Sequence, residues 1–233
     1  MRSGLLVAWT RSWQAGLVSY DEVLDVVQAG GQPHRVTGAI GDVALGRLLM
    51  EVRADRPRLV LPVPGDPRGL PGPGPYTSHA LAAGEAVLAG GWGLVPEAIP
   101  PTVLWHSYAV PAATPDLVPL ADADAELAEA LRDSASALGR LDVAGLRPEL
   151  AGALAAIRRP ASDAGLPPGY PARAHRLLAL ADRIGDILRL AAADAPGAAV
   201  TASAAVQRDD LLRPVAAAAR RARLAAYNTE LTS

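Results

Sequence analysis

Apolar side chains near the start of the chain recur at intervals of three and four residues, the spacing that gathers them on one helix face. The first such face carries Trp9 and Trp13. Ser19 is followed three residues later by Glu22, the pattern of a capping box that starts a helix. The spacing predicts three helices: residues 4–15, a helix from Ser19 to the Gly30-Gly31 pair, and a helix that begins after Asp42 and stops before Pro57.

The pattern then changes to short β-rich runs bounded by Gly and Pro. The clearest strand, residues 102–110, alternates strictly and places His106 and Tyr108 on the same face. The short connections between the later runs favour antiparallel pairing. We therefore expect a small, mainly antiparallel sheet of about four strands (58–63, 85–90, 92–99 and 102–110), with a short helix around Thr77–Ala83.

After a Pro-rich linker at residues 110–119, the pattern is helical throughout. Pro214 should kink or split the last helical region, because proline removes an i→i−4 hydrogen bond. The fold class predicted is α+β: residues 1–115 form an α+β region and residues 116–233 an all-α bundle. The sequence leaves open whether the two regions are separate domains or pack together as one. The helices expected in the second region are 121–141, 147–159, 172–194 and 203–228.

The composition excludes several kinds of catalytic and cofactor chemistry and indicates none. Half of the 233 residues are hydrophobic, the net charge is −2, Cys is absent and all 22 basic residues are Arg. Without Cys there is no disulfide, thiolate nucleophile or iron–sulfur cluster, and without Lys there is no Walker P-loop or pyridoxal phosphate Schiff base. We expect no cofactor, and we interpret the arginine excess as the codon bias of a GC-rich genome.

The N-terminal sequence does not predict export or membrane insertion. Its apolar run stops at Trp9 and Arg11 follows, so a signal peptide is not expected. No run approaches 18 uninterrupted apolar residues, so no transmembrane helix is expected. We predict a cytoplasmic location.

The stretch PVPGDPRGLPGPGP, residues 62–75, is here called the strap. Its four glycines suggest a phosphate cradle, but its six prolines lack the N–H groups that such a cradle needs. No glycine-rich turn is expected to lead directly into a helix N-terminus. The favoured interpretation is a stiff, extended surface connection. Two alternatives are a proline-rich ligand for a partner's groove and the rim of a functional site.

The four histidines are far apart in sequence and lack metal-site spacing. His106 is expected to be half-buried with one hydrogen bond rather than catalytic. If strap and sheet fold together, several polar groups could meet at one rim. The candidate binding residues there are Asp66, His79, Glu85 and His106, with Glu97 as a neighbour. No catalytic residue and no metal ligand is assigned, since the GxSxG and HExxH patterns are absent.

Charged clusters in the helical region are interpreted as exposed faces. The acids Asp122, Asp124, Glu126 and Glu129 do not follow the EF-hand pattern, and Asp182 and Asp186 lie near arginines. Nucleic-acid binding is considered unlikely because the overall charge is negative and aromatic residues are missing nearby; its candidates are Arg213, Arg220, Arg221 and Arg223. A seam of small residues permits close helix packing within the bundle or across a dimer: Ala216, Ala219, Ala222 and Ala226.

The run LPVPGDPRGLPGPGPY, followed by ALAAGEAVL, GLVPEAI and a strand with Trp105-His106, resembles an uncharacterised family of actinobacterial proteins. The resemblance spans most of the chain, including LLRPVAAAARRA near the C-terminus. It implies no activity, so no functional residue can be carried over.

The leading hypothesis is a non-enzymatic module that binds another protein or self-associates, since the residues needed for several kinds of catalysis are absent. Its partner would be an unknown protein or a second copy of the chain. The rival hypothesis is a small-molecule-binding domain or hydrolase with a site at the sheet rim beside the strap. The sequence leans towards a non-enzyme and leaves both hypotheses open.

Overall fold

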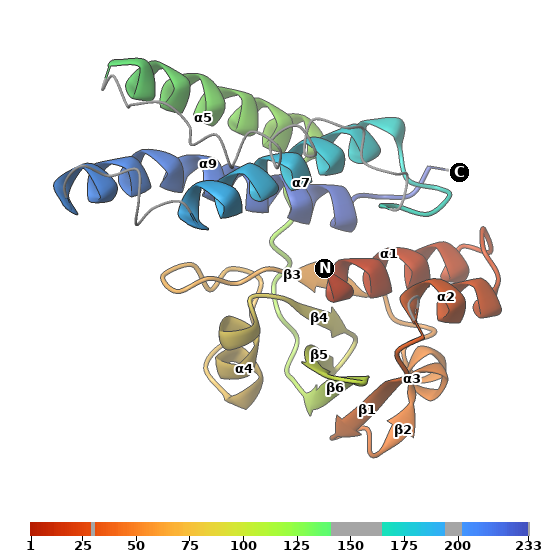
Figure 1. Cartoon of the computed structure of the whole chain (residues 1–233). Coiled ribbons are helices and arrows are strands. Elements are labelled where there is room, and N and C mark those ends of the chain that lie inside the picture. The colour runs from red at the N-terminus through yellow and green to blue at the C-terminus, as the bar shows by residue number, and fades with distance from the viewer. Residues whose placement is uncertain (29–30, 141–164, 194–201, 233) are drawn as a thin grey trace. The chain divides into compact units, whose positions relative to one another are not determined.

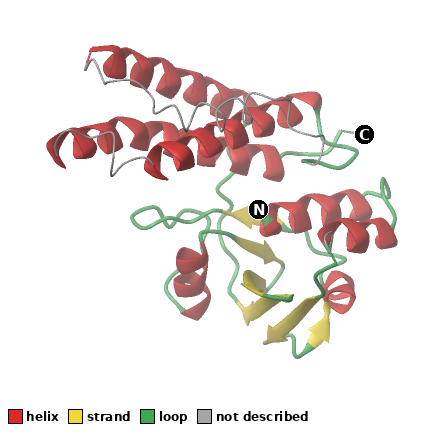
Figure 2. Ribbon diagram, viewed as in Figure 1, coloured by secondary structure: helices red, strands yellow, loops and turns green. Residues whose placement is uncertain are grey.

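The computed structural model describes residues 1–28, 31–140, 165–193 and 202–232. It divides the chain into two compact units. The first is made of Met1–Leu117, Leu166–Pro171 and Tyr227–Ser233, and the second of Val118–Gly165 and Ala172–Ala226. The first unit is mixed α and β, and the described part of the second is helical (Figures 1 and 2). The fold is therefore α+β with a C-terminal helical part.

The first unit is built around a six-stranded sheet in the order β2-β1-β6-β5-β4-β3. Among the described strands, the β1–β6 pair is parallel and the other neighbouring pairs are antiparallel. The strands are β1 (His34–Gly38), β2 (Val43–Ala44), β3 (Arg58–Val60), β4 (Ala86–Ala89), β5 (Trp92–Ile99) and β6 (Thr102–Ala109).

The prediction of about four strands is wrong, because β1 and β2 were missed. β1 is only five residues long and includes polar side chains, and β2 has two residues. Neither is long enough to show the alternation that identifies a strand in a sequence. β1 also pairs with β6, whose residues lie more than 60 positions away. The predicted runs at the other four strands are confirmed.

Helices cover both faces of the sheet. On one face, Ala86, Leu88 and Val95 pack against Tyr76 and Ala80 of α4 (Pro75–Ala83). The opposite face carries buried Val87, Leu94, Val103 and Trp105, while α1 (Arg2–Gln14) contacts β3 to β5, and α3 (Leu45–Glu51) contacts β1 and β2. β4 is buried at every position, as expected of a strand covered on both sides.

The first two N-terminal helices form where the sequence pattern places them, whereas the third begins at Leu45, because Val43 and Ala44 pair with β1. The capping box at Ser19 is confirmed: the Ser19 hydroxyl accepts from the Glu22 N–H at 3.1 Å, and the Glu22 carboxylate accepts from the Ser19 N–H at 2.7 Å. It starts α2 (Tyr20–Val27), which packs against α1. The short helix predicted around Thr77–Ala83 is α4, which begins two residues earlier.

Residues from far along the chain complete the first unit. The buried guanidinium of Arg11 donates to the carbonyls of Tyr227 at 2.9 Å and Thr229 at 2.6 Å. Tyr170 donates its hydroxyl to the same Tyr227 carbonyl at 3.0 Å, and burial raises the pKa of Tyr170 to about 12. Ser12 donates to the Pro168 carbonyl at 2.6 Å. These contacts hold residues 166–171 and the C-terminal segment on α1.

The second unit contains α5 (Leu120–Arg140), α7 (Ala172–Ala193) and most of α9 (Ala202–Asn228). Small residues of α9, including Ala219 and Ala222, pack against Leu127 of α5 and Leu177 of α7. Two residues of the predicted alanine seam, Ala219 and Ala222, are therefore buried in helix contacts within this unit, whereas Ala216 is exposed. The helix expected at 147–159 lies outside the described residues.

One detail of the helical prediction is corrected. α9 continues through Pro214, so the chain is not split there. Pro214 is exposed, and the carbonyl four residues before it can therefore bond to water. On α7, Leu177, Ala181 and Ile184 form the buried face that meets the other helices, and Leu180 and Ile187 are exposed.

No helix in the described ranges combines the length and the apolar composition needed to cross a membrane.

Candidate ligand-binding site

The second half of the strap forms one wall of a pocket of about 470 Å³. The other wall comes from the ends of β1 and β6 and the residues that follow them. We call this hollow the strap pocket. All its lining residues belong to the first unit: Gly38, Ala39, Pro71, Gly72, Pro73, Gly74, Pro75, Tyr76, Thr77, Ser107, Tyr108, Ala109, Val110 and Pro111.

The strap wall is held by the first turn of α4. Gly74 is the N-cap of this helix, its carbonyl accepts from the Ser78 N–H at 3.0 Å, and the Thr77 hydroxyl donates to the Gly72 carbonyl. The expectation that no glycine-rich turn leads directly into a helix N-terminus is therefore wrong. It failed because Pro75 is the first residue of the helix, a position where its missing N–H costs nothing.

Tyr76 anchors the same turn to the sheet. Its hydroxyl donates to the Val87 carbonyl at 3.2 Å, and burial raises its pKa above the usual range. A Cβ added at Gly93 would lie 2.5 Å from the Tyr76 ring, so this position of β5 needs a residue without a side chain. The close approach of ring and backbone fixes the strap beside the sheet.

Ser107 fixes the opposite wall. Its hydroxyl donates to the Thr37 carbonyl at 2.7 Å and accepts from the Ile40 N–H at 2.9 Å, while its carbonyl accepts from the Ala39 N–H at 2.9 Å. Gly38 has φ of +100° there, and a Cβ would lie 2.4 Å from the Ser107 carbonyl oxygen. Both hydrogen bonds of the Ser107 hydroxyl therefore attach the end of β1 to β6.

A polar and aromatic cluster adjoins the pocket through Tyr108. The Tyr108 hydroxyl lies 2.8 Å from His79 Nδ1, and the His79 and His106 rings meet edge to face with centroids 4.7 Å apart. His106 Nε2 lies 2.7 Å from Glu97 Oε2. Burial lowers the pKa of His79, and the neighbouring His106 adds to this while Glu97 opposes it. The lowered pKa makes neutral His79 the main form at pH 7, and its Nδ1 shares one hydrogen bond with the Tyr108 hydroxyl.

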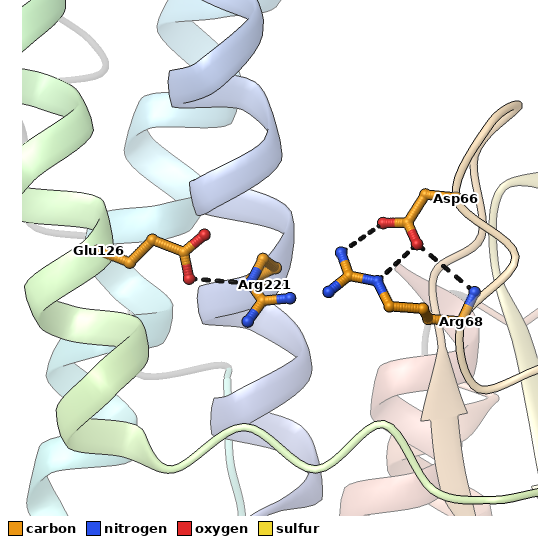
Figure 3. A network of polar contacts seen from close by, with 4 residues as sticks. All are labelled: Asp66, Arg68, Glu126 and Arg221. Atoms are coloured by element: carbon orange, nitrogen blue, oxygen red, sulfur yellow. Dashed lines mark hydrogen bonds and ion pairs between the residues drawn. The ribbon is translucent and has the colours of Figure 1, made fainter.

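Of the four candidate rim residues, the structure brings together His79 and His106 only. Asp66 lies in the strap's first half, where both carboxylate oxygens accept from the Arg68 guanidinium at 2.7 Å (Figure 3). Glu85 accepts from the Ser3 N–H at 2.7 Å and the Arg2 N–H at 3.4 Å, so it caps the N-terminus of α1. Tyr108, which joins the histidines to the pocket, was missed as a site residue, although the strand alternation had placed it beside His106.

The cluster offers hydrogen bonds and proton exchange but no assembled nucleophile. The two aliphatic hydroxyls lining the pocket, Ser107 and Thr77, both donate to backbone carbonyls. Within the described ranges, no group of three or more His, Cys, Asp or Glu residues could hold a metal ion.

Several charged residues of the second unit pair with one another. Glu126 accepts from the Arg221 guanidinium at 2.8 Å (Figure 3), and Asp182 accepts from Arg223 at 2.6 Å. Further pairs join Asp124 to Arg173 at 3.0 Å and Asp210 to Arg213 at 2.6 Å. Arg220 also takes part in a polar interaction. The four arginines considered for nucleic acid thus each have an interaction partner, which lowers their availability to phosphates.

Comparison with known proteins places the chain in a family. The Rv1486c-like N-terminal domain matches residues 3–120 and the Rv1486c-like C-terminal domain matches residues 121–224. The chain belongs to the Rv1486c-like family. It is 31% identical to the uncharacterised protein Rv1486c of Mycobacterium tuberculosis H37Rv, over 98% of this chain and 96% of that protein. It is 28% identical to the uncharacterised protein ML1804 of Mycobacterium leprae, over the same shares of each chain.

These relatives confirm the resemblance to an uncharacterised actinobacterial family. No solved structure matches the chain. The Rv1486c-like family brings no activity with it, so any function has to be argued from the strap pocket and its surroundings.

Proposed function

We propose that this protein binds a small molecule in the strap pocket. The observation that carries the proposal is the pocket itself: its volume of about 470 Å³ lies within the range of ligand sites, roughly 300–1,000 Å³. Its walls combine prolines and tyrosine rings with a few polar groups, the composition typical of such sites. The adjoining His79 has a lowered pKa, which is a further mark of a functional site.

The rigidity of the walls supports this proposal. Proline restricts the strap backbone, and Tyr76 and Ser107 attach the two walls to the sheet by hydrogen bonds. A pocket formed before the ligand arrives loses little conformational entropy on binding. We propose binding rather than hydrolysis, because Ser107 and Thr77 donate to carbonyls and are not paired with a histidine.

The test compares the full chain with a pocket-filling variant in a metabolite-retention experiment. Ala39 is exposed and lines the pocket, so Ala39→Trp should fill it with little effect on the fold. Each protein is incubated with a soluble metabolite extract from an actinobacterium, separated by rapid gel filtration and examined by mass spectrometry. At least one compound should be retained by the wild type and lost from Ala39→Trp.

The matched control is Leu117→Trp, an equally bulky change at an exposed position outside the pocket lining. It should retain the same compounds as the wild type. If the wild type retains nothing that Ala39→Trp fails to retain, the strap pocket is not a metabolite site and the proposal is wrong.

Binding of a protein partner is the second candidate, supported by one feature of α7. Leu180 and Ile187 are 37% and 39% exposed and lie seven residues apart, on the same side of the helix. An apolar pair on a helix face is a common anchor for another helix. Light scattering coupled to gel filtration tests self-association: the double variant Leu180→Asp/Ile187→Asp should reduce the measured mass if the pair mediates a dimer. If the wild type itself has the mass of a monomer, self-association through this pair is excluded.

A further inference from the structure

The register of the sheet shows where the backbone of Ala109 points. The Val110 N–H donates to the Gly91 carbonyl at 2.8 Å, on the β5 side of β6. Because hydrogen-bonding direction alternates along a strand, the N–H and C=O of Ala109 point to the other side, towards β1. Ser107, two residues earlier, has this same direction, since its carbonyl accepts from the Ala39 N–H at 2.9 Å.

β1 ends before it reaches Ala109. Its last paired residue is Gly38, opposite Ser107, and the chain then turns, with the Gly41 N–H donating to the Gly38 carbonyl at 2.9 Å. The next hydrogen-bonding position on this side of β6 belongs to Ala109, and no strand lies opposite it. In the part of the chain that the structure describes, no backbone group of the β1 turn takes up the Ala109 N–H or C=O.

This open position lies in the strap pocket. Gly38, Ala39 and Ala109 all line it, and Ala109 is exposed. The facing wall is the strap, with Pro71 and Pro73 among its residues, and Tyr108 also lines the pocket. The pocket therefore presents a backbone donor and a backbone acceptor from one residue beside surfaces that suit a flat, uncharged group.

We propose that the ligand of the strap pocket carries a hydrogen-bond donor and acceptor side by side, and that this edge pairs with the N–H and C=O of Ala109. The inference rests on the proposed function and adds the chemical class of the ligand. Lactams and aminopyrimidine-type heterocycles present such an edge on a flat ring. The lining residues include no charged side chain, so the ligand is neutral at the part that the pocket encloses.

An extended peptide offers the same edge, because one residue of a strand points its N–H and C=O to the same side. The flat ring is favoured because the pocket volume of about 470 Å³ suits a small molecule and the walls include prolines and tyrosines. The two sources share one chemistry at Ala109, and separate arms of the test distinguish them.

The test uses the ¹⁵N-labelled full chain and 2-quinolone, a bicyclic lactam with adjacent N–H and C=O groups. Titration should shift the amide signals of Ala109 and its pocket neighbours Gly38 and Ala39. N-methyl-2-quinolone, which lacks the donor, should bind roughly tenfold more weakly, the factor expected for one lost hydrogen bond. The peptide arm uses acetyl-Val-Ala-Val-Ala-amide, which should bind more weakly than 2-quinolone; tighter binding would overturn the assignment to flat rings.

The protein-side variant is Ala109→Pro, which removes the N–H. Proline is tolerated in a strand where its missing N–H would face away from the neighbouring strand. The variant should keep the wild-type amide spectrum outside the pocket and bind 2-quinolone roughly tenfold more weakly. Ala109→Ser keeps the N–H and should bind as the wild type does.

Equal affinity for 2-quinolone and its N-methyl derivative, or for wild type and folded Ala109→Pro, would overturn the role of Ala109 while leaving the pocket a binding site. Absence of any shift at pocket residues with millimolar 2-quinolone would also overturn it. The proposed function is decided separately, by metabolite retention with Ala39→Trp. If Ala109→Pro does not fold, the comparison of the two quinolones on the wild type decides the inference.

Discussion

His34 illustrates how a single residue couples the fold to pH. Its side chain is buried, and its Nδ1 accepts a hydrogen bond from the Trp105 indole N–H at 3.3 Å. Burial lowers the pKa of His34 below its usual 6.5, and the nearby positive charge of Arg2 lowers it further. A proton on Nδ1 would remove the acceptor that Trp105 uses. The native state therefore needs neutral His34.

We expect the free energy of unfolding to fall as the pH drops from 7 through 6.5 towards the folded-state pKa of His34. In that window the unfolded chain binds more protons than the folded one, which costs at most about 1.4 kcal/mol per pH unit for each group. Urea unfolding at a series of pH values, followed by tryptophan fluorescence, measures this free energy, since all four tryptophans belong to the first unit.

His34→Gln should flatten this pH dependence. His79 also has a lowered pKa and contributes with the same sign, so His79→Gln serves as the matched control and separates the two contributions. An unchanged slope in His34→Gln would show that His34 is not the group that titrates.

At the scale of elements, the edge strand β3 depends on one distant side chain. The Asn228 carboxamide accepts from the Leu59 N–H at 2.8 Å and donates to the Leu59 carbonyl at 2.9 Å. It makes the two hydrogen bonds that a neighbouring strand would make. An unprotected edge strand is a site for pairing with other chains, so Asn228 completes the sheet and shields its edge.

Asn228→Ala should lower the free energy of unfolding by roughly 1–2 kcal/mol, since two hydrogen bonds to a partly buried backbone are lost. Asn228→Asp keeps the acceptor and loses the donor, so an intermediate value is expected. Urea unfolding of the three proteins measures the series. A wild-type value for Asn228→Ala would mean that water replaces the side chain at no cost.

The sequence was most informative about elements whose signals are local. The Ser19–Glu22 capping box started α2 as predicted, and the alternation of residues 102–110 placed His106 and Tyr108 on one face. β1 escaped detection because its five residues are stabilised by pairing with β6, a contact between distant segments that leaves no periodic pattern.

At the scale of the whole molecule, the first unit is assembled from three separate segments. Among the described residues, buried Arg11 has no carboxylate partner and donates instead to the carbonyls of Tyr227 and Thr229. Burial lowers the pKa of this guanidinium, because removing the charged group from water is unfavourable. The C-terminal segment offsets that cost through its carbonyls, so the N-terminal family domain is not structurally complete by itself.

We therefore expect the fragment 1–120 to unfold at a lower urea concentration than the full chain. The free energy of unfolding of the first unit should be lower in the fragment by at least about 2 kcal/mol. Charged hydrogen bonds of this kind contribute roughly 1.5–3 kcal/mol each, and the fragment loses both acceptors of Arg11. Tryptophan fluorescence compares the same unit in both proteins. Arg11→Met should destabilise the full chain and have little effect on the fragment. Equal unfolding midpoints for fragment and full chain would show that the distant segments add nothing.

The sequence by itself determined the helix and strand periods, the missing Cys and Lys chemistry, and the stiffness of the strap, because these depend on neighbouring residues and on composition. Only the tertiary structure decided that His79 and His106 meet beside Tyr108, that Asp66 and Glu85 serve elsewhere, and that the strap closes a pocket over the end of β1. Those contacts join segments tens of residues apart, and their geometry is set by strand register and packing, which no local pattern encodes.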